Sequence, residues 1–308
     1  MKDWSHTHFE MVSPGRTLAL KLERDWIFDG EERLPAPGDP VARIQIGDFT
    51  EFGRGLVIDG TVQLTETIDA LYTTSLVFPA ALAARRRARW LVLGGGDGAT
   101  PREALRFRDA ESVRLVDISR VVIERTQELI PSFWDGCQRD PRLTLEVRDA
   151  WDALRETAAR DERVDVLVYD LSDPGNAETN PFTESAADRL YSAEAFRLAA
   201  RCLGQDGVFV AQMAELSGVR SDDHFRAREA LGRVFRHVYS YRTHVEPFGY
   251  SESFIVASNR EDGWDPSRGD RVEATLAEVY THDWRSAYSG RWHEHLFTLP
   301  PSLDARQR

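Results

Sequence analysis

Cysteine and long apolar runs are both scarce in this chain. Only two of its 308 residues are cysteine, Cys137 and Cys202, and neither belongs to a CxxC pair or to a zinc-ligand spacing. We therefore expect reduced thiols, no disulfide framework and no metal site. No apolar run approaches the roughly 20 residues that a membrane helix needs. The first residues lack the basic stretch and apolar core of a signal peptide, so we expect a cytoplasmic protein.

Basic residues are outnumbered by acidic ones. The chain has 39 Lys and Arg against 51 Asp and Glu, which gives a formal net charge of −12. Because phosphates attract Lys and Arg, this balance argues against a broad surface for nucleic acid or anionic membrane. It would suit a cationic ligand, although solubility alone also accounts for it.

The first part of the chain is predicted to be rich in β-strands. Strands are expected at residues 17–22, 42–47, 56–58 and 61–64, where β-branched and apolar residues alternate or cluster. The dipeptide Asp59-Gly60 predicts a hairpin between the last two. We assign residues 1–70 to a small antiparallel β domain.

From about Leu71 onward, strand and helix patterns alternate. Such βαβ alternation predicts a mostly parallel, Rossmann-like sheet that is covered on both faces. We assign residues 71–308 to this domain, with a helical and irregular tail from residue 259. Helices are expected at 71–84, from 101, and at 120–129, 151–159 and 193–202, and strands at 90–93, 112–116, 143–147, 164–169, 208–212, 238–243 and 253–257.

A glycine-rich turn follows the strand at 90–93 and leads into a helix. Gly94, Gly96 and Ala99 fit the G-x-G-x-x-A form, in which backbone N–H groups approach a ligand closely because no Cβ blocks them. The signal is weak by itself, since glycine turns also join strands to helices for steric reasons.

Carboxylates at the ends of the neighbouring strands strengthen the case for a nucleoside site. Asp117 can accept both ribose hydroxyls, or it can cap the helix that begins near Ser119. Asp149, before Ala150, can accept the amine of adenine. Asp97 inside the glycine turn would repel a diphosphate and attract a sulfonium or ammonium, which favours an S-adenosyl compound. NAD stays open if Asp97 points into solvent.

The most specific segment is VLVYDLSDP at residues 166–174. Asp170 and Asp173 follow an apolar strand and are expected at the ligand-binding edge of the sheet. A buried carboxylate there needs a charged or hydrogen-bonding partner. A protonated polyamine is such a partner, because one carboxylate can accept a proton from the attacking amine while the other holds a neighbouring ammonium. Alternatively, Asp173-Pro174 forms a turn and Asp170 caps a loop.

These motifs resemble those of the polyamine aminopropyltransferases, a family that includes spermidine, spermine and thermospermine synthases. The resemblance runs from about residue 40 to residue 258, in the family's order and spacing. Residues 239–245 are similar to the thermospermine-type branch. The matching segments are 52–53, 56–63, 66–72, 94–98, 116–118, 148–150 and 170–174.

The resemblance implies transfer of an aminopropyl group from decarboxylated S-adenosylmethionine to a polyamine, with release of methylthioadenosine. It implies no further cofactor, and a homodimer or homotetramer is expected. Asp170 would be the general base. The amine acceptor would meet Tyr72, Asp173, Gln212 and Glu246, and the donor would meet Gln63, Gly94, Gly96, Asp97, Asp117, Asp149 and Ala150.

Several positions depart from the family pattern. Thr73 follows Tyr72 where His or Gln is usual, Ala42 stands where a glutamine is expected, and Glu246 begins the segment that replaces a late tyrosine. Glu246 is either an ammonium contact or a surface charge. These changes leave the acceptor open among diamine, triamine and agmatine. A methyltransferase of the same fold and a non-catalytic relative that binds an adenosyl ligand or a polyamine stay open as alternatives.

Two further features are expected to be structural. The basic segment 85–89 is predicted to be a solvated connector. His282, His293 and His295 lie in the tail without ligand spacing, so we expect them at the surface or in packing.

Overall fold

A small antiparallel sheet leads the chain. The computed structural model describes residues 7–13, 16–28, 43–160, 162–172 and 188–307. The predicted hairpin at Asp59-Gly60 is confirmed, because both residues have the positive φ, +50° and +86°, that a two-residue type I′ turn requires. The five strands pair in chain order: β1 (Thr7–Ser13), β2 (Arg16–Phe28), β3 (Ile44–Phe49), β4 (Gly53–Ile58) and β5 (Thr61–Thr65).

Two details of this sheet differ from the prediction. β1 was not predicted, and β2 continues well past the expected end at residue 22. The charged run in β2 pairs with β3, and Arg24 forms an ion pair with Asp48 of β3, with 3.0 Å between their charged atoms. Ala42 lies outside the described residues.

The main sheet is mostly parallel, as predicted. β6 (Arg89–Gly94), β7 (Ser112–Asp117), β8 (Leu143–Val147), β9 (Val164–Asp170) and β10 (Leu203–Glu215) run parallel, while β12 (Tyr250–Ser258) and β11 (His237–Val245) extend the sheet antiparallel. The strand order is β11-β12-β10-β9-β6-β7-β8. The chain order therefore reverses between β6 and β9, and open α/β sheets bind ligands at the carboxyl ends of strands beside such a switch point.

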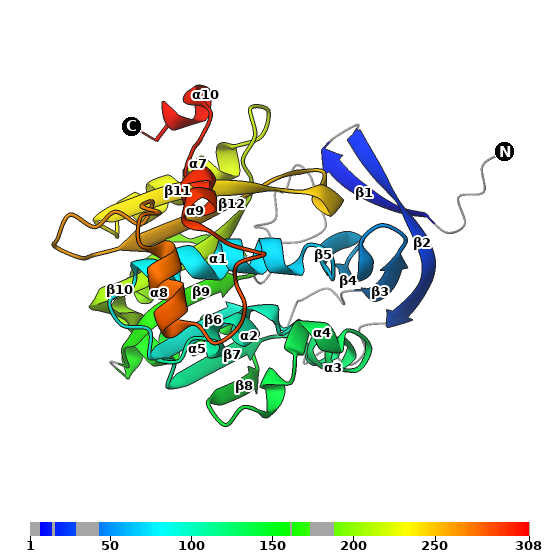
Figure 1. The fold of residues 1–308 in the computed structure, drawn as a ribbon, viewed down its shortest axis with the longest axis horizontal. Helices are drawn as coiled ribbons and strands as arrows, with labels where there is room; N and C mark the ends of the chain where they lie inside the picture. The colour runs from blue at the N-terminus through cyan, green and yellow to red at the C-terminus, as the bar shows by residue number, and fades with distance from the viewer. Residues whose placement is uncertain (1–6, 14–15, 29–42, 161, 173–187, 308) are drawn as a thin grey trace.

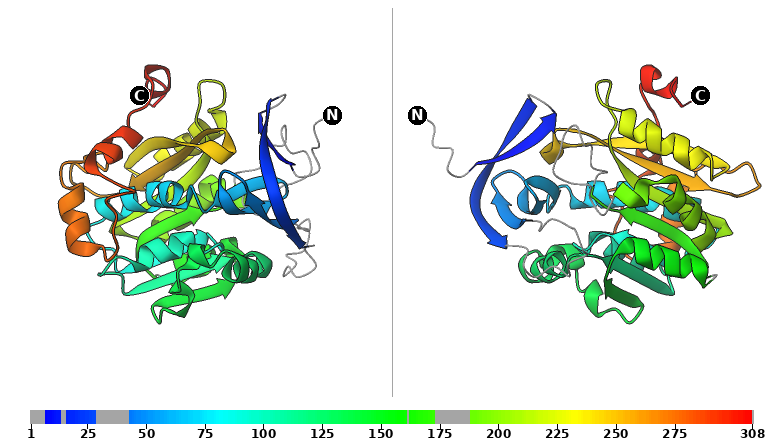
Figure 2. Two further views of the ribbon diagram at one scale, coloured as in Figure 1. Left: turned by 45° about the vertical axis from the view of Figure 1, so that its right-hand side comes forward. Right: turned by 180° about the vertical axis from the view of Figure 1, so that it is seen from behind.

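Helices cover both faces of this sheet (Figures 1 and 2). Successive strand residues supply the two faces, so that Val92 and Val168 belong to one buried cluster and Leu91 and Leu167 to the other. Burial on both faces explains why these strands are continuously apolar. On one face lie α1 (Asp69–Ala83), α2 (Ala99–Leu105), α8 (Val272–Val279) and α9 (Gly290–Leu296), and on the other α5 (Ala150–Ala159), α6 (Ala193–Cys202) and α7 (Asp222–Gly232).

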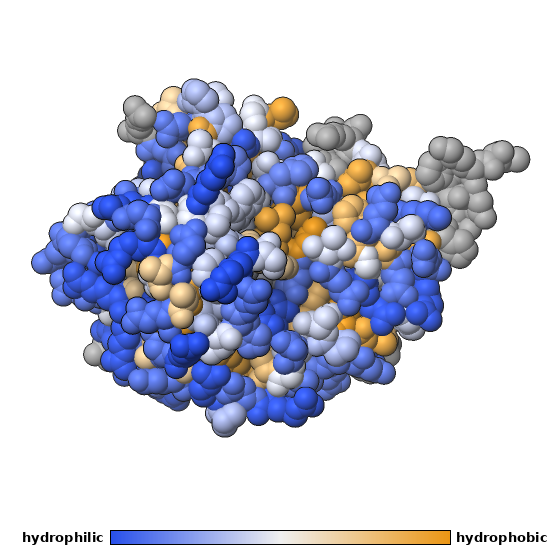
Figure 3. All heavy atoms as spheres, in the orientation of Figure 1, coloured by the Kyte–Doolittle hydropathy of each residue, from blue (hydrophilic) through white to orange (hydrophobic). Residues whose placement is uncertain are grey.

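The two sheets are joined by short elements beside the switch point. α3 (Arg120–Leu129) and α4 (Pro131–Trp134) lie between β8 and the small sheet, and Arg54 of β4 donates to the Leu129 carbonyl at 2.7 Å. β5 ends at Thr65 and α1 begins at Asp69, so the predicted domain boundary at residue 70 falls within the first turn of α1. That boundary stays a prediction. In Figure 3, apolar side chains gather on a mostly hydrophilic face between β12 and the small sheet.

The basic segment 85–89 is not wholly a solvated connector, and the prediction is wrong at Arg87. Its side chain is buried, pairs with Asp109 at 3.0 Å, and donates to the Ala81 carbonyl at 2.6 Å near the end of α1. Cations commonly satisfy the last carbonyls of a helix in this way. His293 is also buried, with Nδ1 2.7 Å from the hydroxyl oxygen of Tyr288, whereas His282 and His295 are exposed.

Among the described residues, none of the helices combines the length and the apolar character needed to cross a membrane. Within the same ranges, no group of three or more His, Cys, Asp or Glu side chains is placed to hold a metal ion.

Candidate active site

The glycine turn after β6 is shaped by two neighbouring carboxylates. Gly95 donates its N–H to the carbonyl oxygen of Asp170 at 2.8 Å. A Cβ at Gly94, where φ is +79°, would collide with that same carbonyl, and a Cβ at Gly96 would lie 2.5 Å from Cγ of Asp117. These glycines therefore allow the ends of β6, β7 and β9 to approach one another.

Asp170 ends β9, and its carboxylate accepts hydrogen bonds from two hydroxyl groups. Thr100 of α2 donates to Oδ2 at 2.6 Å, and Tyr72 of α1 donates to Oδ1 at 3.3 Å. Burial raises the pKa of Asp170 to about 6, and the charge of Asp117 adds to the rise, while the hydroxyls of Thr100 and Tyr72 oppose it. A carboxyl with this pKa can accept a proton near neutral pH. The structure thus brings Tyr72 and Asp170, two of the predicted site residues, into contact.

Asp97 lies in the same acidic cluster and is half-buried. Its Oδ1 accepts the Ala99 amide at 2.8 Å. Burial, followed by the charge of Asp170, raises the pKa of Asp97 to about 8, and Asp69 and Asp117 add to the effect. The alternative in which Asp97 points freely into solvent is therefore not what the structure shows. Anionic ligands are disfavoured at this position and cations are favoured.

Asp117 ends β7 as predicted. Its Oδ2 accepts the Gly96 amide at 3.0 Å and its Oδ1 accepts the Ser119 amide at 2.7 Å. The cap of α3 itself is Ser119, whose hydroxyl oxygen accepts the Val122 amide at 3.2 Å. Asp117 thus links the glycine turn to the start of α3, and its carboxylate lies at the ligand-binding edge.

Asp149 precedes α5 and caps it by accepting the Trp151 amide at 2.8 Å. Its other oxygen lies 2.5 Å from Arg189, a residue that the sequence did not bring to attention. Each carboxylate oxygen has two lone pairs, so the pairing with Arg189 still leaves acceptor capacity for an adenine amine. Ala150 is the buried first residue of α5.

Two predicted acceptor residues differ in burial, and one of them, Gln212, contacts a neighbour of the base. Gln212 is buried on β10, where its amide nitrogen donates to the Leu171 carbonyl and its Oε1 accepts the Ala214 amide at 3.0 Å. It therefore anchors the residue that follows Asp170. Glu246 is exposed at the start of a single 3-10 turn, Glu246–Phe248.

The remaining two predicted residues are not brought to the base by the described contacts. The amide nitrogen of Gln63 donates to the Thr61 carbonyl at 3.1 Å, within β5. Asp173 lies outside the described residues. The roles of both stay predictions.

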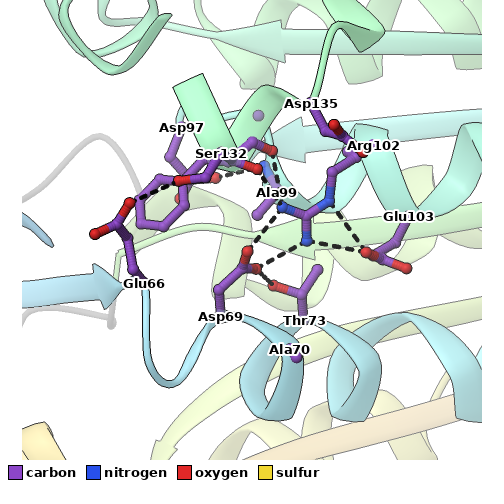
Figure 4. A network of polar contacts seen from close by, with 12 residues as sticks. Glu66, Asp69, Ala70, Thr73, Asp97, Ala99, Arg102, Glu103, Ser132 and Asp135 are labelled. Atoms are coloured by element: carbon purple, nitrogen blue, oxygen red, sulfur yellow. Dashed lines mark hydrogen bonds and ion pairs between the residues drawn. The ribbon is translucent and has the colours of Figure 1, made fainter. Parts of the chain in front are cut away.

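A buried ion-pair network beside the site was missed by sequence reasoning (Figure 4). Arg102 of α2 is 4% exposed and reaches both oxygens of Asp69 at 2.7 and 2.9 Å and Glu103 at 2.9 Å. It also donates to the carbonyls of Ser132 and Phe133 at 3.1 and 3.0 Å. The network therefore ties the first turn of α1, which carries Tyr72, to α2 and α4.

Thr73 belongs to this network. Its side chain is 1% exposed, and its hydroxyl donates to Asp69 at 2.9 Å. The interpretation that this departure alters the acceptor pocket is not supported by these contacts, which direct Thr73 to the ion pair of Arg102.

Comparisons with known proteins identify a family for the chain. The family model described as the spermine/spermidine synthase domain matches residues 70–262. The polyamine aminopropyltransferase of Aeropyrum pernix is 34% identical over 253 residues, which cover 82% of this chain and 75% of the relative. The polyamine aminopropyltransferase of Sulfolobus acidocaldarius is 30% identical over 302 residues, which cover 97% of this chain and 92% of the relative.

Solved structures confirm the predicted fold. A crystal structure of spermidine synthase in complex with the transition state analogue AdoDATO gives a TM-score of 0.83 at 22% identity, and it covers 100% of this chain and 96% of that chain. The crystal structure of spermidine synthase from Thermotoga maritima gives a TM-score of 0.80 at 21% identity, and it covers 98% of this chain and 94% of that chain. The family match and the sequence relatives confirm the resemblance: the chain belongs to the spermine/spermidine synthase family and is an aminopropyltransferase.

Proposed function

We propose that the acidic cluster binds two cationic substrates, decarboxylated S-adenosylmethionine and a polyamine, and that no other cofactor takes part. The observation that carries this proposal is the meeting of Asp97, Asp117 and Asp170 around the glycine turn, with the pKa values of Asp97 and Asp170 both raised. Carboxylates held together in a partly buried place are stabilised by cations.

Asp170 acts as the general base. The lone pair of the acceptor amine forms a bond to the aminopropyl carbon, and the carbon–sulfur bond breaks with its electrons passing to sulfur. The sulfonium becomes a neutral thioether, methylthioadenosine, and the new ammonium gives its proton to Asp170. A base contributes most when its pKa lies near the working pH, and the pKa of about 6 at Asp170 meets that condition.

The donor is held by the glycine turn and the carboxylates that follow the strands. Asp97 takes the aminopropyl ammonium, Asp117 the ribose hydroxyls and Asp149 the adenine amine. Intact S-adenosylmethionine would place its carboxylate near Asp97, where like charges repel, so the methyltransferase alternative is disfavoured. The other predicted donor contacts are Gly94, Gly96, Ala150 and Gln63.

The acceptor approaches Asp170 from the side of Tyr72. The Tyr72 ring packs edge-on against Phe248 and Phe254, with ring centroids 6.2 and 5.8 Å apart, and its hydroxyl faces the base. An aromatic wall beside a carboxylate suits an amine with methylene segments. Asp173, Gln212 and Glu246 complete the proposed acceptor contacts.

The proposal is tested by incubation with decarboxylated S-adenosylmethionine and a panel of diamine, triamine and agmatine, with methylthioadenosine measured by chromatography. Asp170→Asn should lower transfer by about 10²–10⁴-fold, the usual contribution of a general base, while donor binding measured by calorimetry persists. Asp165→Asn is a matched control, because Asp165 lies near the opposite end of the same strand and accepts the Arg89 amide at 2.8 Å.

Each other outcome identifies a different function. Normal turnover by Asp170→Asn would show that the base is misassigned. Release of S-adenosylhomocysteine from S-adenosylmethionine would indicate a methyltransferase, and binding without any product would indicate a non-catalytic relative.

A homodimer or homotetramer is proposed on the family resemblance alone, and a cytoplasmic location on the two cysteines and the lack of a signal-peptide pattern. Light scattering after size-exclusion chromatography measures the first point, and fractionation of the source cells the second. A monomer at working concentration would contradict the proposed assembly.

A further inference from the structure

The hydroxyl of Thr100 binds a carboxylate, as the hydroxyl of Thr73 does, and not the backbone of its helix. A threonine within a helix commonly donates to the carbonyl four residues earlier. Thr74, Thr126 and Thr157 all do so, at 2.6 to 2.8 Å. Thr100, 1% exposed near the start of α2, instead donates to Oδ2 of Asp170 at 2.6 Å. The Thr100 hydroxyl therefore binds a carboxylate of the site and not a backbone carbonyl of its own helix.

The two oxygens of Asp170 have different surroundings. Oδ2 receives the short bond from Thr100, and a Cβ at Gly95 would lie only 3.0 Å from it, so the backbone of the glycine turn closes that side. Oδ1 receives the longer bond of 3.3 Å from Tyr72. Charge-assisted O–H···O bonds are strongest at about 2.5–2.7 Å, so the Thr100 bond is the stronger of the two.

We propose that Thr100 is a positioning residue for the base, which fixes Oδ2 of Asp170 so that Oδ1 is presented to the acceptor amine. This inference rests on the proposed function of Asp170. It assigns the two oxygens different tasks: Oδ2 holds the carboxylate in place, and Oδ1 takes the proton.

The electrostatic surroundings make the Thr100 hydroxyl necessary. The titratable groups that act on Asp170 are Tyr72 from α1, Asp97 from the glycine turn and Asp117 from β7. Both aspartates are acidic, so neither can stabilise the ionised form of Asp170 as a cation would. Asp69 of α1 adds a further negative charge beside Asp97. Among the groups that hold down the pKa of Asp170, the Thr100 hydroxyl has the largest effect. Without it, the carboxyl would retain its proton to higher pH.

The test compares wild type with Thr100→Val, which replaces the hydroxyl by a methyl group of similar size, and with Thr100→Ser, which keeps the hydroxyl. For each protein, kcat/KM for methylthioadenosine release is measured from about pH 5.5 to pH 9, since this quantity reports ionisations of the free enzyme. The ratio of variant to wild type is then plotted against pH. Titration of the polyamine itself cancels in this ratio.

We expect Thr100→Val to be about 10- to 100-fold slower at pH 6, the effect of losing one hydrogen bond to a charged group. Its ratio should rise with pH, because the loss of a donor to the charged form raises the pKa of Asp170 and moves the acid limb to higher pH. Thr100→Ser should stay within about 3-fold of wild type throughout. Thr100→Ala should show the same pH trend as Thr100→Val, and it replaces that variant if the valine does not fold.

Thr157→Val is the matched control, because Thr157 is equally buried but donates to a backbone carbonyl of α5. Its ratio should be independent of pH. A pH-independent ratio near 1 for Thr100→Val would overturn the proposal, and so would an equal, pH-independent loss in the Val and Ser variants, which would indicate packing alone. Failure of the proposed function is distinct, because wild type itself would then release no methylthioadenosine.

Discussion

Replacement of Asp97 by asparagine should stabilise the protein while impairing its activity. The pKa of Asp97 is raised from 3.8 to about 8 by burial and by Asp170, Asp69 and Asp117. Its Oδ1 accepts the Ala99 amide at 2.8 Å, and an asparagine oxygen can keep that bond. The substitution therefore removes the charge and leaves the local geometry in place.

The sign of the effect follows from proton linkage. Because the native state holds a proton that the unfolded chain releases, the wild type loses stability as pH rises from about 4 to about 8. One pKa unit corresponds to about 1.4 kcal/mol, so the ceiling at pH 7 is about 4 kcal/mol. Partial exposure of the side chain screens the charge, and we expect a gain of about 1–2 kcal/mol for Asp97→Asn.

Urea denaturation of the ligand-free protein between about pH 5 and pH 8 measures this gain as the difference in unfolding free energy. The difference should be small at pH 5 and should grow with pH. Transfer should fall by about 10²-fold or more, because the donor ammonium loses a charged partner in a partly buried place.

Asp48→Asn provides a control of opposite sign. The hydrogen bond from Arg54, 2.6 Å long, lowers the pKa of Asp48, so its charge stabilises the fold above the ordinary pKa. This variant should lose up to about 1 kcal/mol at neutral pH. The reasoning about Asp97 fails if Asp97→Asn is no more stable than wild type at pH 8, or if its advantage does not grow with pH.

Three further predictions concern the surroundings of the site. Gly94→Ala should lose about 2–4 kcal/mol in chemical denaturation, because its methyl group would meet the backbone of β9, whereas Gly60→Ala, at a positive φ in open space, should lose about 1 kcal/mol. Arg102→Met should lose about 3–5 kcal/mol in the same assay, since Asp69 would be left largely buried without its cation. Polyamine binding should release protons between about pH 6 and pH 8 and tighten as pH rises, because cations favour ionised carboxyls, as calorimetry in buffers of different ionisation enthalpy can measure.

The main sheet could be predicted from the sequence because its strands are buried on both faces. The helices at 120–129 and 193–202 were also predicted with the bounds that the structure shows. α7 was missed because a histidine takes one of its buried positions. His224 is acceptable there because Ser253 and Ser240 lie 2.7 and 2.8 Å from its ring nitrogens, and both serines come from distant strands. Hydrophobic periodicity cannot anticipate such partners.

Some residues of the candidate site could likewise be predicted from the sequence, and others could not. Asp97, Asp117 and Asp170 could be predicted to meet because each follows a parallel strand, and topology alone brings those ends together. Thr100 and Arg102 belong to a helix, and their partners depend on how α1 packs against α2. A signal was available, however, since Arg102 and Glu103 fall within a helix that the alternating pattern places against the sheet, where buried charges must pair.

The raised pKa of Asp170 bears on product release as well as on catalysis. Transfer removes the positive charge from sulfur, and the same charge reappears as a proton on Asp170, so the net charge of the site is unchanged by the reaction. The distribution does change, because Asp170 becomes neutral beside the new polyamine and no longer attracts it as a carboxylate. A base of ordinary aspartate acidity would return that proton to the product amine or to water more readily. With a pKa of about 6, raised by burial and lowered by the Thr100 hydroxyl, Asp170 holds the proton more firmly than an ordinary aspartate would, and at neutral pH it ionises again for the next turnover.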